Sequence, residues 1–593
     1  MSIIPSRIAA LRQVMQERGI HTYIVLSSDA HQSEYVASYW RGRAYISGFT
    51  GSAGTVVITT EKAACWVDGR YYLQGEQQLQ GTGVDLMKMG QPDVPTWQEY
   101  VVANTPENGT VGIDGRTIGS FQAEALKKQM EEKHLSLACQ EDLLNLVWTD
   151  RPELPQGPIF DLPVEYAGQS RSEKLARLRR YMEKKKADYY LIASLESSAW
   201  LLNYRGSDVH ATPVAYAFTL VGRTTCDFFI ETSKVPADVE EKLNADGVQV
   251  HPYDALSAWI QTLPVSRIAL DKKLINQLLM ESIPASWTIL EEETDAVIGM
   301  KAVKNRVEQE NFRKAHIKDG TVMVHFLRWV KEHTDAGLTE YDAVEVLDQL
   351  RSDQENSRGI SFSTIAGYGS NGAIVHYSPQ PETCATIEPK SFLLVDSGGQ
   401  YLEGTTDITR TIACGPLTDE EKRIYTLVLK GHLALGHAIF KEGATGTHLD
   451  ILARKPLWDR GLDYRHGTGH GVGYLLSVHE GPHSISYGIN KIKLEPGMII
   501  SNEPGFYPTG KFGVRIENLV LVVPYEENEW GRFYRMETLT MCPYERDAIV
   551  KELLTAEEIA QINAYHQEVL AKVGPLLTDE KDLAFLESAT QPL

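Results

Sequence analysis

Acidic residues in the last third of this sequence lie inside or beside strand-like apolar runs. They are Asp396 after FLLV, Asp407 in TTDITRTI, Glu503 at the end of MIISNE, and Glu517 in VRIENLVLVV. A buried carboxylate is costly unless it is paired or binds a metal. The nearby strand cations, Arg410 and Arg515, do not outnumber the four acids. We therefore expect bound cations among them.

A pair of divalent cations would supply four positive charges against these four carboxylates. His470, within GTGHG, offers a neutral nitrogen ligand. This oxygen-rich set favours Mn²⁺, with Co²⁺, Fe²⁺ or Zn²⁺ as alternatives, over thiolate-bound zinc or an iron–sulfur cluster. Two ions about 3.5 to 4 Å apart would hold a hydroxide between them as a nucleophile.

The spacing of the acids predicts two pairs of strands. Asp396 and Asp407 are eleven residues apart with a glycine-containing segment between them, and Glu503 and Glu517 are fourteen apart with prolines and glycines between them. Turns in these segments would let both members of a pair face the same point. We expect a site built on two hairpins.

An internal similarity predicts that the first half of the chain contains a duplication. LRQVMQERGIHTYIV and LRRYMEKKKADYYLI align Leu11 with Leu178, Met15 with Met182 and Tyr23 with Tyr190, each 167 positions apart. Each copy has the pattern of a helix followed by a strand. The alternative is that two unrelated amphipathic helices share a few letters.

Proline content and helix signals give the expected boundaries. DRPELPQGPIFDLP, at 150–163, is rich in proline and predicts an extended linker. A long helix pattern begins near residue 304 and marks a new domain. We expect domains at 1–155, 156–300 and 301–593.

The third domain mixes helices with strands. Capping boxes at Thr418 with Glu421, and at Thr555 with a glutamate three positions later, predict helix starts. The four acid-bearing runs are strand-like and are broken by glycine and proline. The expected class is therefore mixed, α/β or α+β, rather than a helical bundle.

Composition excludes several classes of partner. The formal charge of −21 opposes binding to nucleic acid, because neutralising phosphates needs clustered lysine and arginine. No apolar run approaches the roughly 18 residues of a membrane helix, and the N-terminal segment lacks the apolar core of a signal peptide. The six cysteines are widely scattered. These features predict a cytoplasmic protein without a membrane or nucleic-acid partner.

The ordered motifs resemble a known family. VDSGGQYLEGTTDITRT, HGTGHGVG, VHEGPH, SNEPGFY and GVRIEN are similar, in that order, to the C-terminal domain of the M24 metallopeptidases, which has the pita-bread fold. DAHQSEY, FTGSAGT and DGRYYLQ extend the resemblance to the cytosolic, three-domain Xaa-Pro aminopeptidases of subfamily M24B. It implies two creatinase/prolidase-type N-terminal domains before a catalytic pita-bread domain, a homodimer and two Mn²⁺ ions.

The resemblance also implies an activity and a ligand set. The implied enzyme releases the N-terminal residue from peptides with proline in second position, by attack of a metal-bridging hydroxide. Asp396 would bind the first metal, Asp407 and Glu517 would bridge both, and His470 with Glu503 would complete the second.

Further roles follow from matching motif positions. His376 in AIVHYSP and His479 in VHEGP are expected to donate hydrogen bonds to the substrate carbonyl or its developing oxyanion. Glu503 is placed to take the proton of the nucleophile and pass it to the departing proline nitrogen. His466 is a further catalytic candidate, with a packing role as the alternative. His483 has no assigned role.

Substrate contacts are less specific in the sequence. Proline has no amide N–H, so its recognition must come from shape, and Phe506 and Tyr507 are candidates for an apolar or aromatic pocket. Arg515 would share a strand face with Glu517 and orient a carboxylate. Arg70 in DGRY resembles a substrate-contacting arginine of the family, with a salt bridge inside the first domain as the alternative.

Two other functions compete with this interpretation. A prolidase would share the metal ligands but cleave only dipeptides. A metal-poor interaction protein on the same fold would lack ligands, whereas all five ligand positions are filled here. Hydrolysis of Xaa-Pro against Xaa-Pro-Xaa peptides, and metal analysis, separate these cases.

Overall fold

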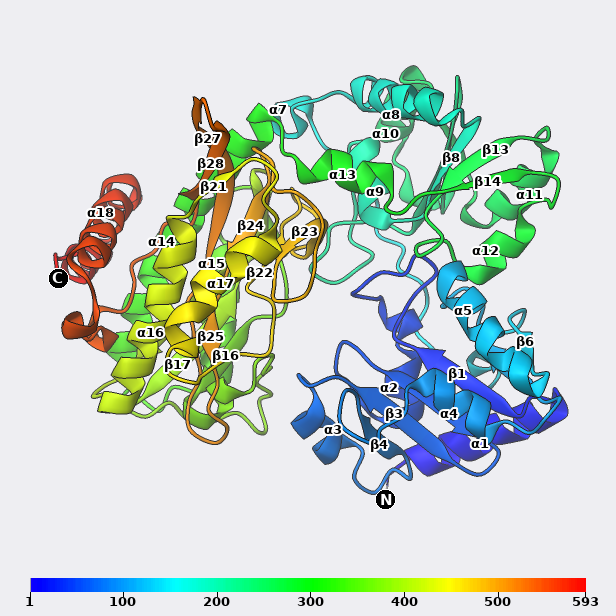
Figure 1. The fold of residues 1–593 in the computed structure, drawn as a ribbon, viewed down its shortest axis with the longest axis horizontal. Helices are drawn as coiled ribbons and strands as arrows, with labels where there is room; N and C mark the ends of the chain where they lie inside the picture. Colours follow the sequence, from blue (N-terminus) through cyan, green and yellow to red (C-terminus); the bar gives the residue numbers. More distant parts are fainter. Residues whose placement is uncertain (1) are drawn as a thin grey trace. The chain divides into compact units, whose positions relative to one another are not determined.

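The computed structural model describes residues 2–593 and divides the chain into two compact units (Figure 1). Unit 1 comprises residues 1–162, 169–210 and 214–297, and unit 2 comprises 163–168, 211–213 and 298–593. Each unit has its own cores of buried apolar side chains.

Unit 1 contains two six-stranded sheets with the same topology. Their strand orders are β4-β3-β2-β1-β5-β6 and β12-β11-β10-β8-β13-β14. In each sheet, counted along the chain, the first strand pairs antiparallel with the second and parallel with the fifth, and both edge strands pair in parallel. The strands are β1 Thr22–Leu26, β2 Thr55–Thr59, β3 Ala63–Val67, β4 Asp85–Lys88, β5 Thr110–Ile113, β6 Ser136–Ala138, β8 Tyr189–Ile192, β10 Ala217–Gly222, β11 Cys226–Ile230, β12 Gln249–His251, β13 Arg267–Leu270 and β14 Thr288–Glu291.

The repeated topology supports the predicted duplication. Helix α1 (Ile4–Glu17) and helix α8 (Arg171–Lys185) precede the first strand of each sheet. The matched Leu11 and Leu178 are both fully buried, because each lies on the apolar face of its helix. The aligned letters therefore correspond to equivalent structural positions.

Shorter helices complete unit 1. They are α2 Gly42–Ser47, α3 Tyr72–Gln78, α4 Trp97–Asn104, α5 Ser120–Met130, α6 Leu144–Val147, α9 Leu195–Leu201, α10 Ala237–Ala245, α11 Leu256–Thr262 and α12 Gln277–Ser282. The proline-rich segment has neither helix nor strand over 151–159, as expected for an extended linker, before the short strand β7 (Phe160–Asp161), which pairs with β9 (Tyr204–Arg205).

Unit 2 is built on several antiparallel sheets. The largest has the order β21-β28-β27-β24-β22-β23, and smaller ones have the orders β16-β17-β20, β15-β18-β19 and β25-β26. The strands are β15 Ser357–Ile360, β16 Ile365–Tyr368, β17 Phe392–Ser397, β18 Gly399–Tyr401, β19 Gly404–Thr405, β20 Ile408–Ala413, β21 Ile439–Lys441, β22 Gly469–Gly471, β23 Glu480–Ile485, β24 Ile499–Asn502, β25 Gly505–Phe506, β26 Val514–Arg515, β27 Asn518–Asn528 and β28 Gly531–Thr538.

Long helices pack against these sheets. They are α14 Arg306–His333, α15 Glu340–Ser352, α16 Asp419–Gly436, α17 Gly446–Trp458, α18 Ala556–Val573 and α19 Glu580–Ala589, with the short α7 Val164–Ala167 also in unit 2 and α13 Ala296–Ala302 where the chain enters it. The apolar face of α14 shares a core with β17 and β20. The predicted capping boxes at Thr418 and Thr555 are confirmed, each accepting from the backbone N–H of the glutamate three residues on.

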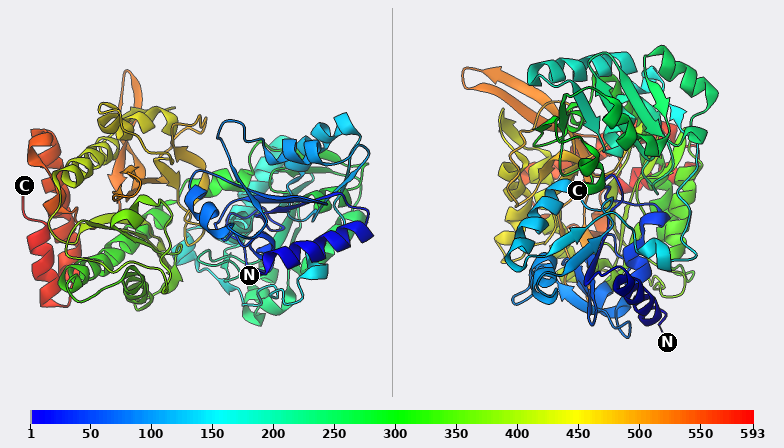
Figure 2. Two further views of the ribbon diagram at one scale, coloured as in Figure 1. Left: turned by 90° about the horizontal axis from the view of Figure 1, so that it is seen from below. Right: turned by 90° about the vertical axis from the view of Figure 1, so that its right-hand side faces the viewer.

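The long pair β27–β28 runs as one hairpin (Figure 2). Trp530 near its turn is 70% exposed. In the described residues no disulfide is present, and the cysteines are free. No described helix combines the length and apolar composition that a membrane crossing would need.

Candidate metal centre

Two antiparallel strand pairs carry the four acidic residues. In the first pair Asp396 of β17 lies opposite Thr409 of β20, and Asp407 immediately precedes β20. In the second pair β24 ends one residue before Glu503, and β27 begins one residue after Glu517. The prediction of two strand pairs is confirmed. The segment between the first two acids is more than a turn, because it forms β18 and β19.

The acid-bearing strand ends converge with His470. The imidazole Nε2 of His470 lies 3.5 Å from Asp407 Oδ2 and 3.6 Å from Glu503 Oε1. Asp407, His470 and Glu517 each offer one ligand atom, and these atoms lie within 4.8 Å of one another. Asp407 and Glu517 are only 4% and 1% exposed. Carboxylates from both strand pairs thus face one buried point.

Burial and mutual repulsion dominate the electrostatics. Burial, followed by the charges of Asp396 and Glu503, holds the pKa of Asp407 well above its ordinary value. Burial, followed by the charge of Asp407, does the same for the pKa of Glu517. Among the described residues, the buried Oδ1 of Asp396 accepts no hydrogen bond. Crowded hard oxygen donors with an unused lone pair fit divalent cations.

The Arg515 guanidinium joins the centre through hydrogen bonds to Asp396, Thr409 and Tyr507. Its Nη2 donates to Asp396 Oδ2 at 2.6 Å, so the carboxylate that it contacts belongs to the protein itself. Its Nε donates to Thr409 Oγ1 at 3.2 Å, and Thr409 in turn donates to Glu517 Oε2 at 2.7 Å. Its Nη1 donates to the Tyr507 hydroxyl at 2.8 Å. Arg515 ends β26 and Glu517 lies between β26 and β27, so the two do not share one strand as expected.

Thr409 was not predicted, although a signal for it exists. It lies two positions after Asp407, and alternate residues of a strand share a face. Ser501 was missed in the same way: its hydroxyl accepts from the backbone N–H of His470 at 3.0 Å and donates to Glu503 at 3.4 Å. Serine and threonine are so common that the sequence does not mark these two as part of the site unless the strand register is known.

The structure places the three other candidate histidines near the centre. The rings of His479 and His470 lie 4.4 Å apart. His376 follows Val375, whose carbonyl accepts from Arg515 at 3.4 Å. His466 uses both ring nitrogens on protein partners, with Nδ1 2.7 Å from the Gly467 carbonyl and Nε2 2.8 Å from the Tyr507 hydroxyl.

His466 is held as a neutral ring. Burial, and then the charge of Arg515, lower its pKa to about 3. A neutral ring that donates from Nδ1 to Gly467 must accept at Nε2, so Tyr507 donates to His466 while it accepts from Arg515. This chain of hydrogen bonds fixes the orientation of Tyr507.

The glycines on both sides of His470 allow the neighbouring strands to approach closely. A Cβ on Gly469 would collide with the Ser501 carbonyl, and one on Gly471 would collide with the Glu480 carbonyl. The glycines therefore let β22 lie between β23 and β24. Close packing of the strands therefore accounts for the glycines on both sides of His470.

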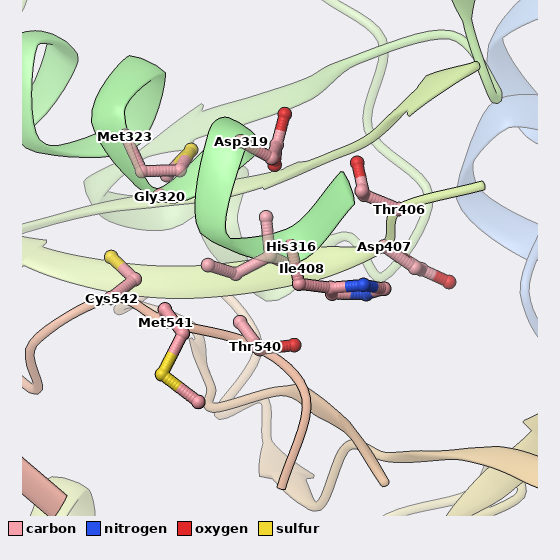
Figure 3. A pocket seen from close by; sticks show the side chains of 10 residues that line it. All are labelled: His316, Asp319, Gly320, Met323, Thr406, Asp407, Ile408, Thr540, Met541 and Cys542. Carbon is pink, nitrogen blue, oxygen red and sulfur yellow. The ribbon is translucent and has the colours of Figure 1, made fainter. Parts of the chain in front are cut away.

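Residues of helix α14 line one pocket together with Asp407 (Figure 3). His316, Asp319 and Gly320 of α14 line a small pocket together with Asp407 and the segment 540–542. Gly320 is required at this contact, because a Cβ there would collide with the Met541 carbonyl. Helix α14 is thereby packed closely against the segment 540–542, which lines the same pocket as Asp407.

Arg70 and His483 lie in different surroundings. Arg70, in unit 1, pairs with Asp68 through Nη2 at 2.8 Å, which is the alternative foreseen for it. His483 is 2% exposed and its Nε2 lies 3.0 Å from the Ile499 carbonyl, so it joins β23 to β24.

Family models match nearly the whole chain. Two models of the creatinase/prolidase N-terminal domain match residues 7–143 and 150–308. The model of metallopeptidase family M24 matches residues 310–524, and that of the C-terminal region of this family matches 532–593.

Full-length relatives agree with these matches. A probable Xaa-Pro aminopeptidase P of Laccaria bicolor is 42% identical over 99% of this chain and 93% of that protein, and aminopeptidase P2 of Arabidopsis thaliana is 39% identical over 100% and 89%. The crystal structure of X-prolyl aminopeptidase from Caenorhabditis elegans, described as a cytosolic enzyme with a di-nuclear active site, has a TM-score of 0.94 and 33% identity over 100% of both chains.

Fold and site together define a metal-dependent hydrolase. Its two amino-terminal repeats match creatinase/prolidase N-terminal models, and its carboxylate-rich centre lies within the segment that matches metallopeptidase family M24. The chain belongs to metallopeptidase family M24.

Proposed function

We propose that this chain is an Xaa-Pro aminopeptidase, which releases the N-terminal residue from peptides with proline in second position. The observation that carries the proposal is the convergence of buried carboxylates from two strand pairs on His470. The names of full-length relatives at 39% to 42% identity supply the substrate class.

Two divalent metal ions complete the site in this proposal, with Mn²⁺ preferred and Co²⁺, Fe²⁺ or Zn²⁺ as alternatives. Asp396 would hold one ion and His470 with Glu503 the other, while Asp407 and Glu517 would serve both. When bound, such a pair polarises the scissile carbonyl and supplies a nucleophile at neutral pH.

The protein's own groups handle protons and developing charge. Glu503 takes the proton of the nucleophile and delivers it to the proline nitrogen, which becomes the new amino terminus. His376 and His479 donate hydrogen bonds to the carbonyl oxygen as its negative charge grows. His466 and Arg515 hold Tyr507 in place. Phe506 packs against the adjacent core and stays a candidate for the proline pocket.

Other parts of the proposal concern the whole protein. We propose a three-domain division at about residues 155 and 300 and a homodimer, both from the resemblance of the sequence motifs to the M24B family. A cytoplasmic location is also proposed, and the description of the C. elegans enzyme as cytosolic supports it. Arg70 is proposed to contact substrate. Peptides with an N-terminal Xaa-Pro are the proposed partners, and nucleic acids are not expected because of the net charge of −21.

The test measures hydrolysis of a short Xaa-Pro-Xaa peptide with Mn²⁺, with a chelator, and beside an Xaa-Pro dipeptide. The proposal expects cleavage of the longer peptide before proline and its loss with chelator. Cleavage of the dipeptide alone would instead identify a prolidase. Purified protein without stoichiometric divalent metal under Mn²⁺ supplementation would favour an interaction protein.

A further inference from the structure

Two lysines and one glutamate form a buried ion cluster in unit 2, outside the metal ligands. Lys301 Nζ lies 2.6 Å from Glu480 Oε2, and Lys304 Nζ lies 2.5 Å from Glu480 Oε1. The three side chains are 5%, 1% and 2% exposed, respectively. Each carboxylate oxygen thus has its own buried ammonium group.

The backbone around these lysines is held on both sides. Lys301 lies in the last turn of α13, and the N–H of Lys304 donates to the Gly497 carbonyl at 2.9 Å. The carbonyl of Lys304 accepts from Gln309 Nε2 at 2.7 Å. Asn305 then caps α14 in a capping box with Glu308. Both ammonium groups therefore start from fixed positions.

The charges are nearly balanced within the cluster. The buried Glu308 attracts Lys304 and offsets the second lysine. Burial raises the pKa of Glu480, but the two lysines outweigh burial and lower it. His483, in the same strand β23 as Glu480, is neutral, since burial lowers its pKa to about 4. The cluster consists of two cations and two anions enclosed by protein.

A buried ion cluster contributes little net stability to a fold, because its charges must be removed from water. Removing charges from water is costly, and apolar residues of similar volume often stabilise a protein equally well or better. What a buried ion pair supplies in addition is a single permitted geometry. The residue whose geometry is fixed here is Glu480.

Glu480 immediately follows His479 in the chain. Glu480 begins β23 and lies opposite Gly471, the residue after the expected ligand His470. A Cβ on Gly473 would come within 3.1 Å of Glu480 Oε2, so the carboxylate is also enclosed by the loop that leads to His479. Holding Glu480 therefore sets where the backbone of His479 enters β23, and with it the ring 4.4 Å from His470.

We propose that Lys301 and Lys304 are positioning residues for catalysis, which act through Glu480 to hold His479 in its hydrogen-bonding orientation toward the substrate carbonyl. This rests on the proposed role of His479. The segment at the start of unit 2 would then affect the reaction rate, although neither lysine is among the expected metal ligands or substrate contacts.

The test compares Lys301→Met with Lys234→Met in the full-length, metal-loaded protein. Lys234 is a matched control, because it forms a similarly buried pair with Asp208 at 2.6 Å and lies in unit 1. For Lys301→Met we expect kcat on an Xaa-Pro-Xaa peptide to fall about ten- to hundredfold, with KM within about threefold and metal content unchanged. For Lys234→Met we expect a lower Tm and kcat within about twofold.

A double-mutant cycle with His479→Ala identifies the route of the effect. If Lys301 acts through His479, the double variant loses little more kcat than His479→Ala alone. Additive losses would overturn the proposal, as would an unchanged kcat in Lys301→Met beside a Tm loss like that of the control. Full activity of His479→Ala would refute the proposed role of His479 itself, and the inference with it. Lys301→Gln is judged by the same criteria if Lys301→Met does not fold.

Discussion

Replacing Asp407 with asparagine should have opposite effects on the metal-free and metal-loaded protein. Asparagine keeps the size of the side chain and removes its negative charge. In the metal-free protein this charge faces the carboxylate of Glu517 inside a buried cluster. With metals present the same charge would offset the cations, because Asp407 is a proposed ligand.

The magnitude follows from the separation of the two carboxylates. Their nearest candidate ligand atoms lie within 4.8 Å. Two unit charges at about that distance repel by roughly 3.5 kcal/mol at an effective dielectric constant of about 20. Proton uptake by the raised-pKa acids limits the gain, so we expect Asp407→Asn to stabilise the metal-free protein by about 1 to 3 kcal/mol.

Thermal unfolding with and without chelator measures how Asp407→Asn changes Tm in the metal-free and the metal-loaded protein. In chelator the variant should unfold about 2 to 4 °C above the unmodified protein. With Mn²⁺ the order should reverse, because the variant gains less from metal binding, and peptide hydrolysis should be abolished. Asp459→Asn is the control, since this exposed acid pairs only with a surface lysine and should change Tm little in either condition.

One result would refute the electrostatic reasoning. If Asp407→Asn lowered Tm equally with and without chelator, the carboxylate would act through hydrogen bonds or packing rather than through its charge. The assignment of the four acids as a metal-requiring cluster would then fail.

Three other predictions concern histidines and Tyr507. Burial lowers the pKa of His31 to about 3, so between pH 7 and 5 only the unfolded chain takes up a proton at this histidine, near pH 6.5. The free energy of unfolding should therefore be highest above pH 6.5 and fall by about 2 kcal/mol from pH 7 to 5. Denaturation of His31→Asn should show a flatter pH dependence. Tyr507→Phe breaks the bonds to His466 and Arg515 and should lower kcat about tenfold while metal analysis shows unchanged content. His376→Ala should slow peptide hydrolysis yet keep both metals; loss of metal would show that it is a ligand.

Much of the site could be predicted because it depends on local patterns. Acids such as Asp407 and Glu517 stand out in apolar strand runs, and their spacing predicts the strand pairs. The aligned Leu11 and Leu178 predicted a repeat that the two sheets share, because burial on a helix face constrains the residue type in both copies.

The remaining features depend on contacts between distant segments. Lys301 and Glu480 are far apart in the sequence, and each letter alone suggests an ordinary surface charge. The reason for Gly469 appears only when the neighbouring strand is known. The pairing of Arg70 with Asp68 was foreseen as an alternative, because two residues so close in sequence can meet without a tertiary contact.

The division of the acids between two strand pairs has a consequence for biosynthesis. Glu517 lies just before β27, so a nascent chain that ends before this position lacks one of the carboxylates proposed to hold the metals. If the proposed ligand set is right, the complete metal site can form only after most of the polypeptide has been synthesised and both strand pairs have formed.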